Sequence, residues 1–193
     1  MQNSDRGDGS WPPLTMTRRS LLVGGSDHEF RLLVERMVLF ASRLQEMRAG
    51  LAAHMQVSPP QFRIVMVLAR AETPEMTATE LASALEVSTA FIVTEAQKLG
   101  ELGLVTRRRN PDDARSFLLA LSPLARERVI EAAPLMCRVN NTLFASMDRA
   151  MMQRLTEMTQ DLLDASGEAL ALLHEAVEVP AKPVRRARKG TRD

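Results

Sequence analysis

The densest group of chemically informative side chains is a run of three arginines, Arg107, Arg108 and Arg109, followed by Asp113 and Arg115. Guanidinium groups keep their charge and present several N–H donors in a planar fork, which suits the oxygens of a phosphate. A carboxylate beside a phosphate is repelled, so Asp113 is better suited to orienting Arg115 through a charge-assisted pair. The run indicates a phosphate-binding surface, with a merely solvated face as the alternative.

Side chains that bind metals or react with oxidants are few and scattered. The single cysteine, Cys137, is expected to be a small buried apolar residue, and an exposed redox-sensing thiol is the alternative. His28, His54 and His174 lack metal-ligand spacing such as H-x-x-x-H, so a zinc sensor is a weaker alternative. Glycine-rich phosphate loops and the G-x-S-x-G motif are absent, which predicts a protein that is not an enzyme and uses no cofactor.

Length and composition limit the class of protein. The 193 residues are 45% hydrophobic and 25% charged, which predicts either one ordinary folded domain or a small domain with an oligomerisation extension. No apolar run approaches the roughly 20 residues that span a bilayer, and one cysteine cannot form an intrachain disulfide, so we expect a cytoplasmic protein. The net charge of +1 does not by itself indicate a nucleic-acid partner, so such an interface must arise from local placement.

The N-terminal half contains two predicted helices. Apolar residues recur at steps of three and four, which predicts a helix from about residue 28 to 55. Its stripe contains Phe30, Leu33, Met37, Phe40, Leu44, Met47 and Leu51. Ser58 then caps a second helix, with two prolines in its first turn and Gln61 as the capping-box partner, and this helix ends before Pro74.

Two short helices and a ribbon follow. Thr77 and Glu80 form a capping box that opens a helix over TATELASALE, and Ser88 caps another over STAFIVTEAQKLGEL, which stops at Gly103. LVTRRR and SFLLALS are predicted to be two strands around the turn NPDDA. The order helix, turn, helix, ribbon predicts a winged helix-turn-helix, a mainly α fold with a two-stranded β-wing.

Long helices are predicted to flank this domain. Pro123 begins a helix that runs to about residue 146, and Asp148 caps a last one. The predicted organisation is a flexible extension (1–26), a dimerisation helix (27–57), the winged domain (58–122), dimerisation helices (123–176) and a basic flexible tail (177–193). The apolar faces of the long helices exceed what so small a domain can bury, which predicts a two-fold homodimer. Its interface residues are expected to be Phe30, Leu33, Met37, Phe40, Leu44, Leu155, Leu162 and Leu163.

From Ser58 to Pro123 the sequence resembles the MarR family of bacterial regulators. The resemblance is carried by SPPQFRIVMVLAR, TATELASALEVS and KLGELGLVTRRRNPDDARSFLLALSP. The third segment is the most specific, because its glycine turn, arginine run and Asp113-x-Arg115 wing signature follow the family's order and spacing. The resemblance implies a dimeric, ligand-responsive repressor that binds a pseudo-palindromic operator in double-stranded DNA. It also implies an effector site between the dimerisation helices and the winged domain. The scarcity of positive and metal-binding side chains there favours a small apolar or aromatic effector over a metal ion.

Recognition is expected to be divided between the helix from Ser88 and the ribbon. We expect Ile92, Leu99 and Leu102 to face inward. The opposite face of this helix is expected to meet the major groove through Ser88, Thr89, Ala90, Val93, Thr94 and Lys98. Arg107, Arg108, Arg109 and Arg115 are expected to meet phosphates or the minor groove. Residues 59–123 hold seven Arg or Lys against eight Asp or Glu, so a winged helix used for protein–protein contacts is the alternative.

Overall fold

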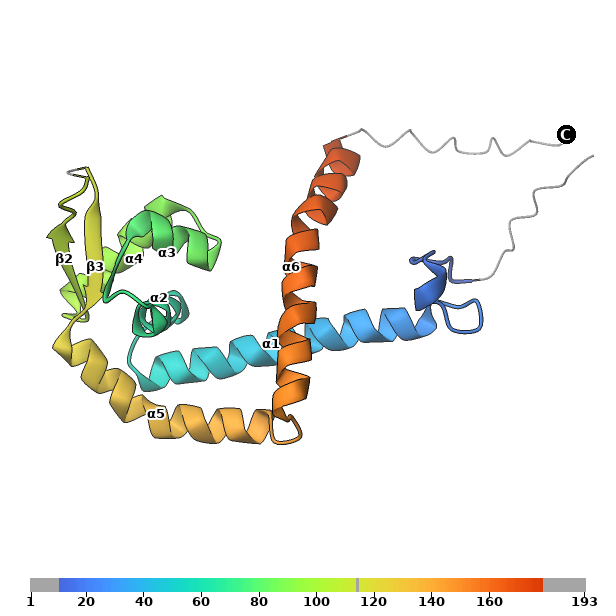
Figure 1. The fold of residues 1–193 in the computed structure, drawn as a ribbon, viewed down its shortest axis with the longest axis horizontal. Helices are drawn as coiled ribbons and strands as arrows, with labels where there is room; N and C mark the ends of the chain where they lie inside the picture. Colours follow the sequence, from blue (N-terminus) through green and yellow to red (C-terminus); the bar gives the residue numbers. More distant parts are fainter. Residues whose placement is uncertain (1–10, 114, 179–193) are drawn as a thin grey trace, which may run out of the picture. The chain divides into compact units, whose positions relative to one another are not determined.

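The computed structural model describes residues 11–113 and 115–178, which belong to two compact units, 1–142 and 143–193 (Figure 1). The elements of the first unit are the 3-10 helix η1 (Arg19–Leu21), α1 (His28–His54), α2 (Pro59–Arg70), β1 (Glu75–Thr77), α3 (Ala78–Leu85), α4 (Thr89–Glu101), β2 (Val105–Arg109), β3 (Phe117–Leu121) and α5 (Pro123–Leu143). The second unit contains α6 (Arg149–Glu178). The predicted winged helix-turn-helix is confirmed, with α3 and α4 as its two short helices and β2 and β3 as its wing.

The sheet has one strand more than the sequence predicts. Its order is β1-β3-β2, and all pairs are antiparallel, with Thr77 opposite Leu118 and Arg108 also opposite Leu118. β1 is only three residues long and ends on the residue that caps α3, so it has no room for the alternation by which a strand is recognised. The strand joins the wing to the start of α3.

The core of the first unit lies between α2, α3, α4 and the sheet. Its most completely buried apolar side chains are Ile64, Leu81, Ile92, Leu99 and Leu104. The prediction that Ile92 and Leu99 face inward is confirmed. The same prediction for Leu102 is wrong, because this residue lies beyond the last helical turn and is exposed.

The segment before α1 is held against the start of this helix. The sequence predicts a flexible extension over residues 1–26, but its described part, 11–26, contains η1 and a short β-bridge between Val23 and Ser26. The buried Asp27 carboxylate accepts hydrogen bonds from the Thr15 N–H at 2.6 Å and the Thr15 hydroxyl at 2.8 Å, and pairs with Arg31 at 2.9 Å. These contacts fix the path of residues 15–27.

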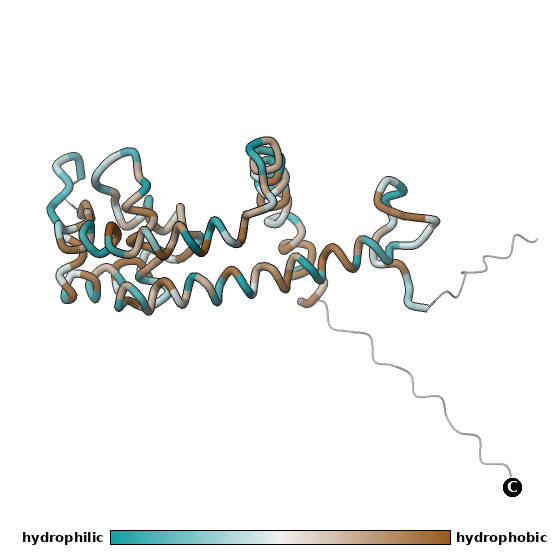
Figure 2. The backbone as a smooth tube through the Cα atoms, turned by 90° about the horizontal axis from the view of Figure 1, so that it is seen from below, coloured by the Kyte–Doolittle hydropathy of each residue, from teal (hydrophilic) through white to brown (hydrophobic). Residues whose placement is uncertain are grey.

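The long helices carry many exposed apolar residues. Figure 2 shows where hydrophobic residues, coloured brown, recur along these helices. On α1 the exposed apolar residues begin after the first turn, at Leu33, and continue to Phe40, whereas Leu51 joins the winged core. On α6 they extend from Met151 to Val177, and the first two residues of the predicted tail, 177 and 178, belong to this helix. The tail from 179 onward lies outside the described residues. No helix among the residues described is long and apolar enough to cross a membrane.

Candidate nucleic-acid interface

The first helix of the motif, α3, is fixed at both ends by local hydrogen bonds. The predicted capping box is present: the Thr77 hydroxyl accepts the Glu80 N–H, and the Glu80 carboxylate accepts the Thr77 N–H at 2.6 Å. At the other end Glu86 adopts the left-handed conformation, with φ of 53°, and donates its N–H to the carbonyls of α3. This closes the helix and turns the chain toward α4.

The second helix of the motif, α4, has one buried and one exposed side. Ser88 caps it as predicted, because its hydroxyl accepts the Phe91 N–H at 3.2 Å. The residues expected to read the major groove are all exposed: Ser88, Thr89, Ala90, Val93, Thr94 and Lys98. The Thr94 hydroxyl donates to the Ala90 carbonyl at 3.0 Å, which orients its lone pairs and its methyl group outward from the helix. The charged groups exposed on α4 are Lys98 and, at the last helical position, Glu101, which also lines the cleft described below.

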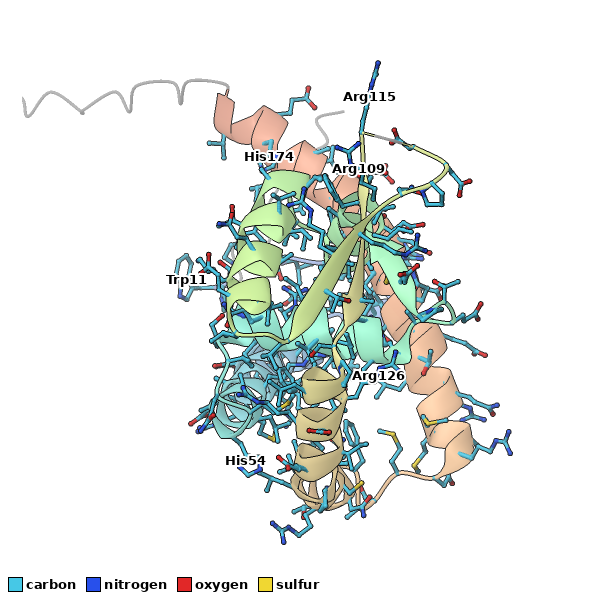
Figure 3. All side chains as sticks on the ribbon, turned by 90° about the vertical axis from the view of Figure 1, so that its left-hand side faces the viewer. Trp11, His54, Arg109, Arg115, Arg126 and His174 are labelled. Atoms are coloured by element: carbon cyan, nitrogen blue, oxygen red, sulfur yellow. The ribbon has the colours of Figure 1, made fainter. Side chains whose placement is uncertain are left out.

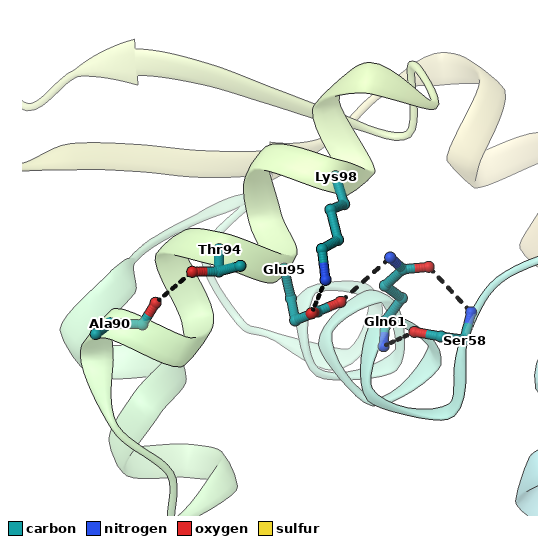
Figure 4. A network of polar contacts seen from close by, with 6 residues as sticks. All are labelled: Ser58, Gln61, Ala90, Thr94, Glu95 and Lys98. Atoms are coloured by element: carbon teal, nitrogen blue, oxygen red, sulfur yellow. Dashed lines mark hydrogen bonds and ion pairs between the residues drawn. The ribbon is translucent and has the colours of Figure 1, made fainter.

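A buried carboxylate joins α4 to α2 (Figure 4). Glu95 accepts hydrogen bonds from Gln61 Nε2 at 3.2 Å and from Lys98 Nζ at 2.7 Å. Gln61 is itself held by the α2 capping box, in which its Oε1 accepts the Ser58 N–H at 3.0 Å. The positive charge of Lys98, counted above among the DNA contacts, is therefore already paired within its own helix.

The wing arginines divide between the two faces of the ribbon. Successive residues of a strand point to opposite faces, so Arg107 and Arg109 share the face of buried Val105, and Arg108 lies on the other. The Arg107 guanidinium stacks on the Phe117 ring, 3.3 Å from its centre. Arg108 makes two hydrogen bonds to the carboxylate of Glu75 in β1, one of them from Nε at 2.6 Å.

This ion pair shifts the titration of both partners. The hydrogen bonds from Arg108 lower the pKa of Glu75 below its ordinary value, and those to Glu75 raise the pKa of Arg108. Sequence reasoning missed Glu75 as a partner, because the two residues are 33 positions apart and meet only through the sheet.

The tip of the wing carries two more arginines, Arg109 and Arg115, which lie at its far end (Figure 3). Both are exposed, and neither forms an ion pair with another described residue. Asp113 accepts the main-chain N–H of Arg115 at 3.0 Å, in place of the predicted pair with its guanidinium. The carboxylate therefore shapes the turn and leaves the Arg115 side chain unengaged by this bond.

An open cleft of about 600 Å³ separates the wing from the helix-turn-helix. α4 lines one side with Thr89, Val93 and Gln97, and the ribbon lines the other with Arg107 and Phe117. Arg115 borders the cleft, whereas Arg108 is not part of its lining. The cleft thus brings together the exposed side of α4 and the arginine face of β2.

A second, smaller hollow lies between two of the flanking helices. This hollow, of about 360 Å³, lies where the end of α1 meets α5. It is lined by His54, Gln56, Arg128 and Glu131, and Arg128 donates to the Met55 carbonyl at 3.2 Å. The lining of this hollow is mainly polar.

The structure also shows where the cysteine and the possible metal ligands lie. The prediction that Cys137 is buried is wrong: it is exposed on α5, because the buried positions of this helix are Ala125 and Ala132 and Cys137 lies on another side. Within residues 11–113 and 115–178 no group of three or more His, Cys, Asp or Glu is placed to hold a metal ion.

Comparison with solved structures shows the same fold in several regulators. PcaV from Streptomyces coelicolor, in complex with its natural ligand, is 21% identical over 66% of this chain and 91% of its own, with a TM-score of 0.54. A mutant MarR from E. coli, complexed with operator DNA, is 17% identical over 67% and 93%, with a TM-score of 0.57. AbsC, a MarR family transcriptional regulator from Streptomyces coelicolor, is 16% identical over 71% and 94%, with a TM-score of 0.61.

The sequence comparisons locate the similarity in the winged domain. No curated protein matches the chain. The sequence model of the MarR family matches residues 55–116, which extend from the end of α1 to the wing tip. Over this segment the chain is similar to the MarR family, and its fold is the winged helix-turn-helix fold of the MarR structures compared above.

Proposed function

We propose that this chain regulates transcription by binding double-stranded DNA, with α4 in the major groove and the wing on the adjacent backbone or minor groove. The observation that carries the proposal is that the exposed side of α4 and the arginine face of β2 flank one open cleft. An α-helix fits the major groove, and cations at its side are attracted by the phosphates. MarR from E. coli, bound to operator DNA in its structure, has the same fold.

The positive charges available to DNA are distributed unequally between α4 and the wing. Lys98 is the only basic residue of α4, and it is paired with Glu95. Electrostatic attraction therefore falls mainly on Arg107, Arg109 and Arg115 of the wing. Thr89, Ala90, Val93 and Thr94 offer methyl and hydroxyl groups, which contact thymine methyls and hydrogen-bonding base edges. In this assignment the wing supplies affinity and α4 supplies base preference.

We further propose that the DNA-binding form is a homodimer acting as a ligand-responsive repressor on a pseudo-palindromic operator. The exposed apolar residues that α1 carries in the first unit and α6 carries in the second favour association of two copies, because each unit by itself leaves its own residues in water. PcaV contains its natural ligand in its structure, and this chain has a hollow at the junction of α1 and α5. The His54 and Arg128 side chains there favour an effector with a polar or acidic group attached to its apolar part.

The test measures affinity for a selected operator and for a random duplex at several salt concentrations. Arg109→Ala should weaken binding to both duplexes. It should also reduce the salt slope, which is the steepness with which the logarithm of the binding constant falls with the logarithm of the salt concentration, by about 0.9 for one lost phosphate contact. Thr94→Ala should change base preference by about 1 to 3 kcal/mol. Arg126→Ala is the matched control, because Arg126 is exposed on α5 away from the wing tip (Figure 3).

The alternative function is a winged helix that binds another protein. The observation in its favour is the exposed apolar pair Phe91 and Val93 on α4, with exposed fractions of 39% and 51%. If the unmodified protein shows no salt-dependent binding to any duplex, the DNA-binding proposal fails and this alternative is favoured. Loss of affinity in the wing variants, with Arg126→Ala unchanged, supports DNA binding.

A further inference from the structure

Of the three arginines of β2, Arg108 lies on a different face of the strand from the other two. Arg107 and Arg109 lie on the same face of the strand, and on this face Arg107 lines the cleft and lies over Phe117. Arg108 lies on the opposite face, with Leu118 of β3 directly beside it. Because its guanidinium is engaged by both oxygens of Glu75, it has fewer donors for a phosphate than its neighbours have.

The partner of Arg108 comes from a strand that does not pair with β2. In the sheet order β1-β3-β2 the central strand separates Glu75 from Arg108, so their ion pair bridges across β3. β1 leads directly into α3, whose first turn is fixed by Thr77. The bridge thus ties the outer strand of the wing to the segment that begins the helix-turn-helix.

We infer that the Glu75–Arg108 pair is a clasp that positions the wing, so that Glu75 is a positioning residue for DNA binding and Arg108 makes no DNA contact. This inference rests on the proposed DNA-binding function. The clasp holds β2 in the orientation in which Arg107 lines the cleft and Arg109 lies on the same face of the strand. Its loss therefore weakens binding without removing a phosphate contact.

The clasp is suited to mutational testing because both side chains are partly exposed, with exposed fractions of 54% for Arg108 and 26% for Glu75. Exposed ion pairs contribute little to the free energy of unfolding, so the variants are expected to fold. Binding, in contrast, depends on the placement of the wing cations relative to two DNA strands.

The experiment compares Glu75→Gln, Arg108→Gln and the charge exchange that combines Glu75→Arg with Arg108→Glu. Each single variant should lose about five-fold in affinity for a selected operator with no change in the salt slope, and the exchange should restore most of that loss. Arg109→Gln is the comparison for a true phosphate contact, with a slope lower by about 0.9. Arg43→Gln controls for loss of one charge and one exposed ion pair on α1.

A second readout, which does not need DNA, is amide hydrogen exchange in β2 and β3. The single variants should exchange faster there, and the charge exchange should restore protection. If Arg108→Gln lowers the salt slope and the exchange variant binds worse than either single variant, Arg108 contacts phosphate and the inference is overturned. If no duplex binds at all, the proposed function fails. In that case, amide protection of β2 and β3 that is unchanged in the single variants overturns the clasp as well. Protection that is lost in the single variants and recovered in the charge-exchange variant supports the clasp.

Discussion

The guanidinium carbon of Arg107 lies over the ring of Phe117, 3.3 Å from the ring centre, at the edge of the cleft beside α4. The two residues come from neighbouring strands of the wing, in which Phe117 is opposite Arg109. A cation over an aromatic face is attracted by the electrons of the ring. The ring therefore limits the positions available to a long side chain and keeps its charge at the cleft.

We predict that Phe117→Leu weakens DNA binding by about two- to five-fold, because a cation–π contact at an exposed site contributes about 0.5 to 1 kcal/mol. The salt slope should stay the same, since Arg107 keeps its charge. Arg107→Ala should instead lower the slope by about 0.9. Phe117→Tyr retains the ring and serves as control, and a Phe117→Leu variant with unchanged affinity would show that stacking does not position Arg107.

Helix boundaries were predictable from sequence because they depend on local hydrogen bonds. Ser58, Thr77 and Ser88 each cap the helix that they were expected to cap, and Asp148 accepts the Met151 N–H at 2.7 Å. In each case the two bonded groups are three residues apart, so residue types and spacing contain the information.

Contacts between residues far apart in the sequence were not predictable in the same way. The strand β1 exists because Glu75–Thr77 pair with β3, more than forty positions further on. The partner of Arg108 depends on that pairing and on the order of the three strands. The exposure of Cys137 depends on which side of α5 meets the winged core, and its position in sequence does not fix that side.

The buried carboxylate of Glu95 should make a larger contribution to stability than the exposed carboxylate of Glu101 in the same helix. Glu95→Ala leaves Gln61 Nε2 without its partner in a buried site, which should reduce the free energy of unfolding by about 1 to 3 kcal/mol. Glu95→Gln retains an acceptor for Gln61 and should cost less. Urea denaturation of these variants beside Glu101→Ala checks the prediction, and equal effects of the two alanine substitutions would contradict it.

Acid should release the segment before α1 from this helix. Hydrogen bonds from Thr15, together with the charge of Arg31, lower the pKa of Asp27 below its ordinary value. A carboxyl group whose pKa is depressed by folding stabilises the folded form above its ordinary pKa, and this stabilisation disappears as the pH falls through the lower, folded value. The segment is therefore expected to stay attached at neutral pH and to detach only below about pH 4.

Trp11, the only tryptophan of the chain, reports this release. Its fluorescence anisotropy should decay faster at low pH, and Asp27→Asn should produce part of the same change at neutral pH, because an amide does not pair with Arg31. Glu29→Gln is the control, since Glu29 is exposed in the first turn of α1. Identical decay in the unmodified protein and in Asp27→Asn would contradict the role assigned to the carboxylate.

The exposed apolar surface of α1 should determine whether two chains associate. Phe40, with an exposed fraction of 44%, is outside the winged core, so replacing it leaves that core intact. In a dimer interface Phe40→Asp places an unpaired charge among apolar groups, which is unfavourable unless the charge finds a partner. Sedimentation at micromolar concentration should show the unmodified protein as a dimer and Phe40→Asp with a much larger monomer fraction.

Ser42→Asp introduces the same charge at an exposed polar position of the same helix and should remain dimeric. A folded, monomeric unmodified protein would contradict the dimer, and an equal effect of both substitutions would place the interface elsewhere on the chain.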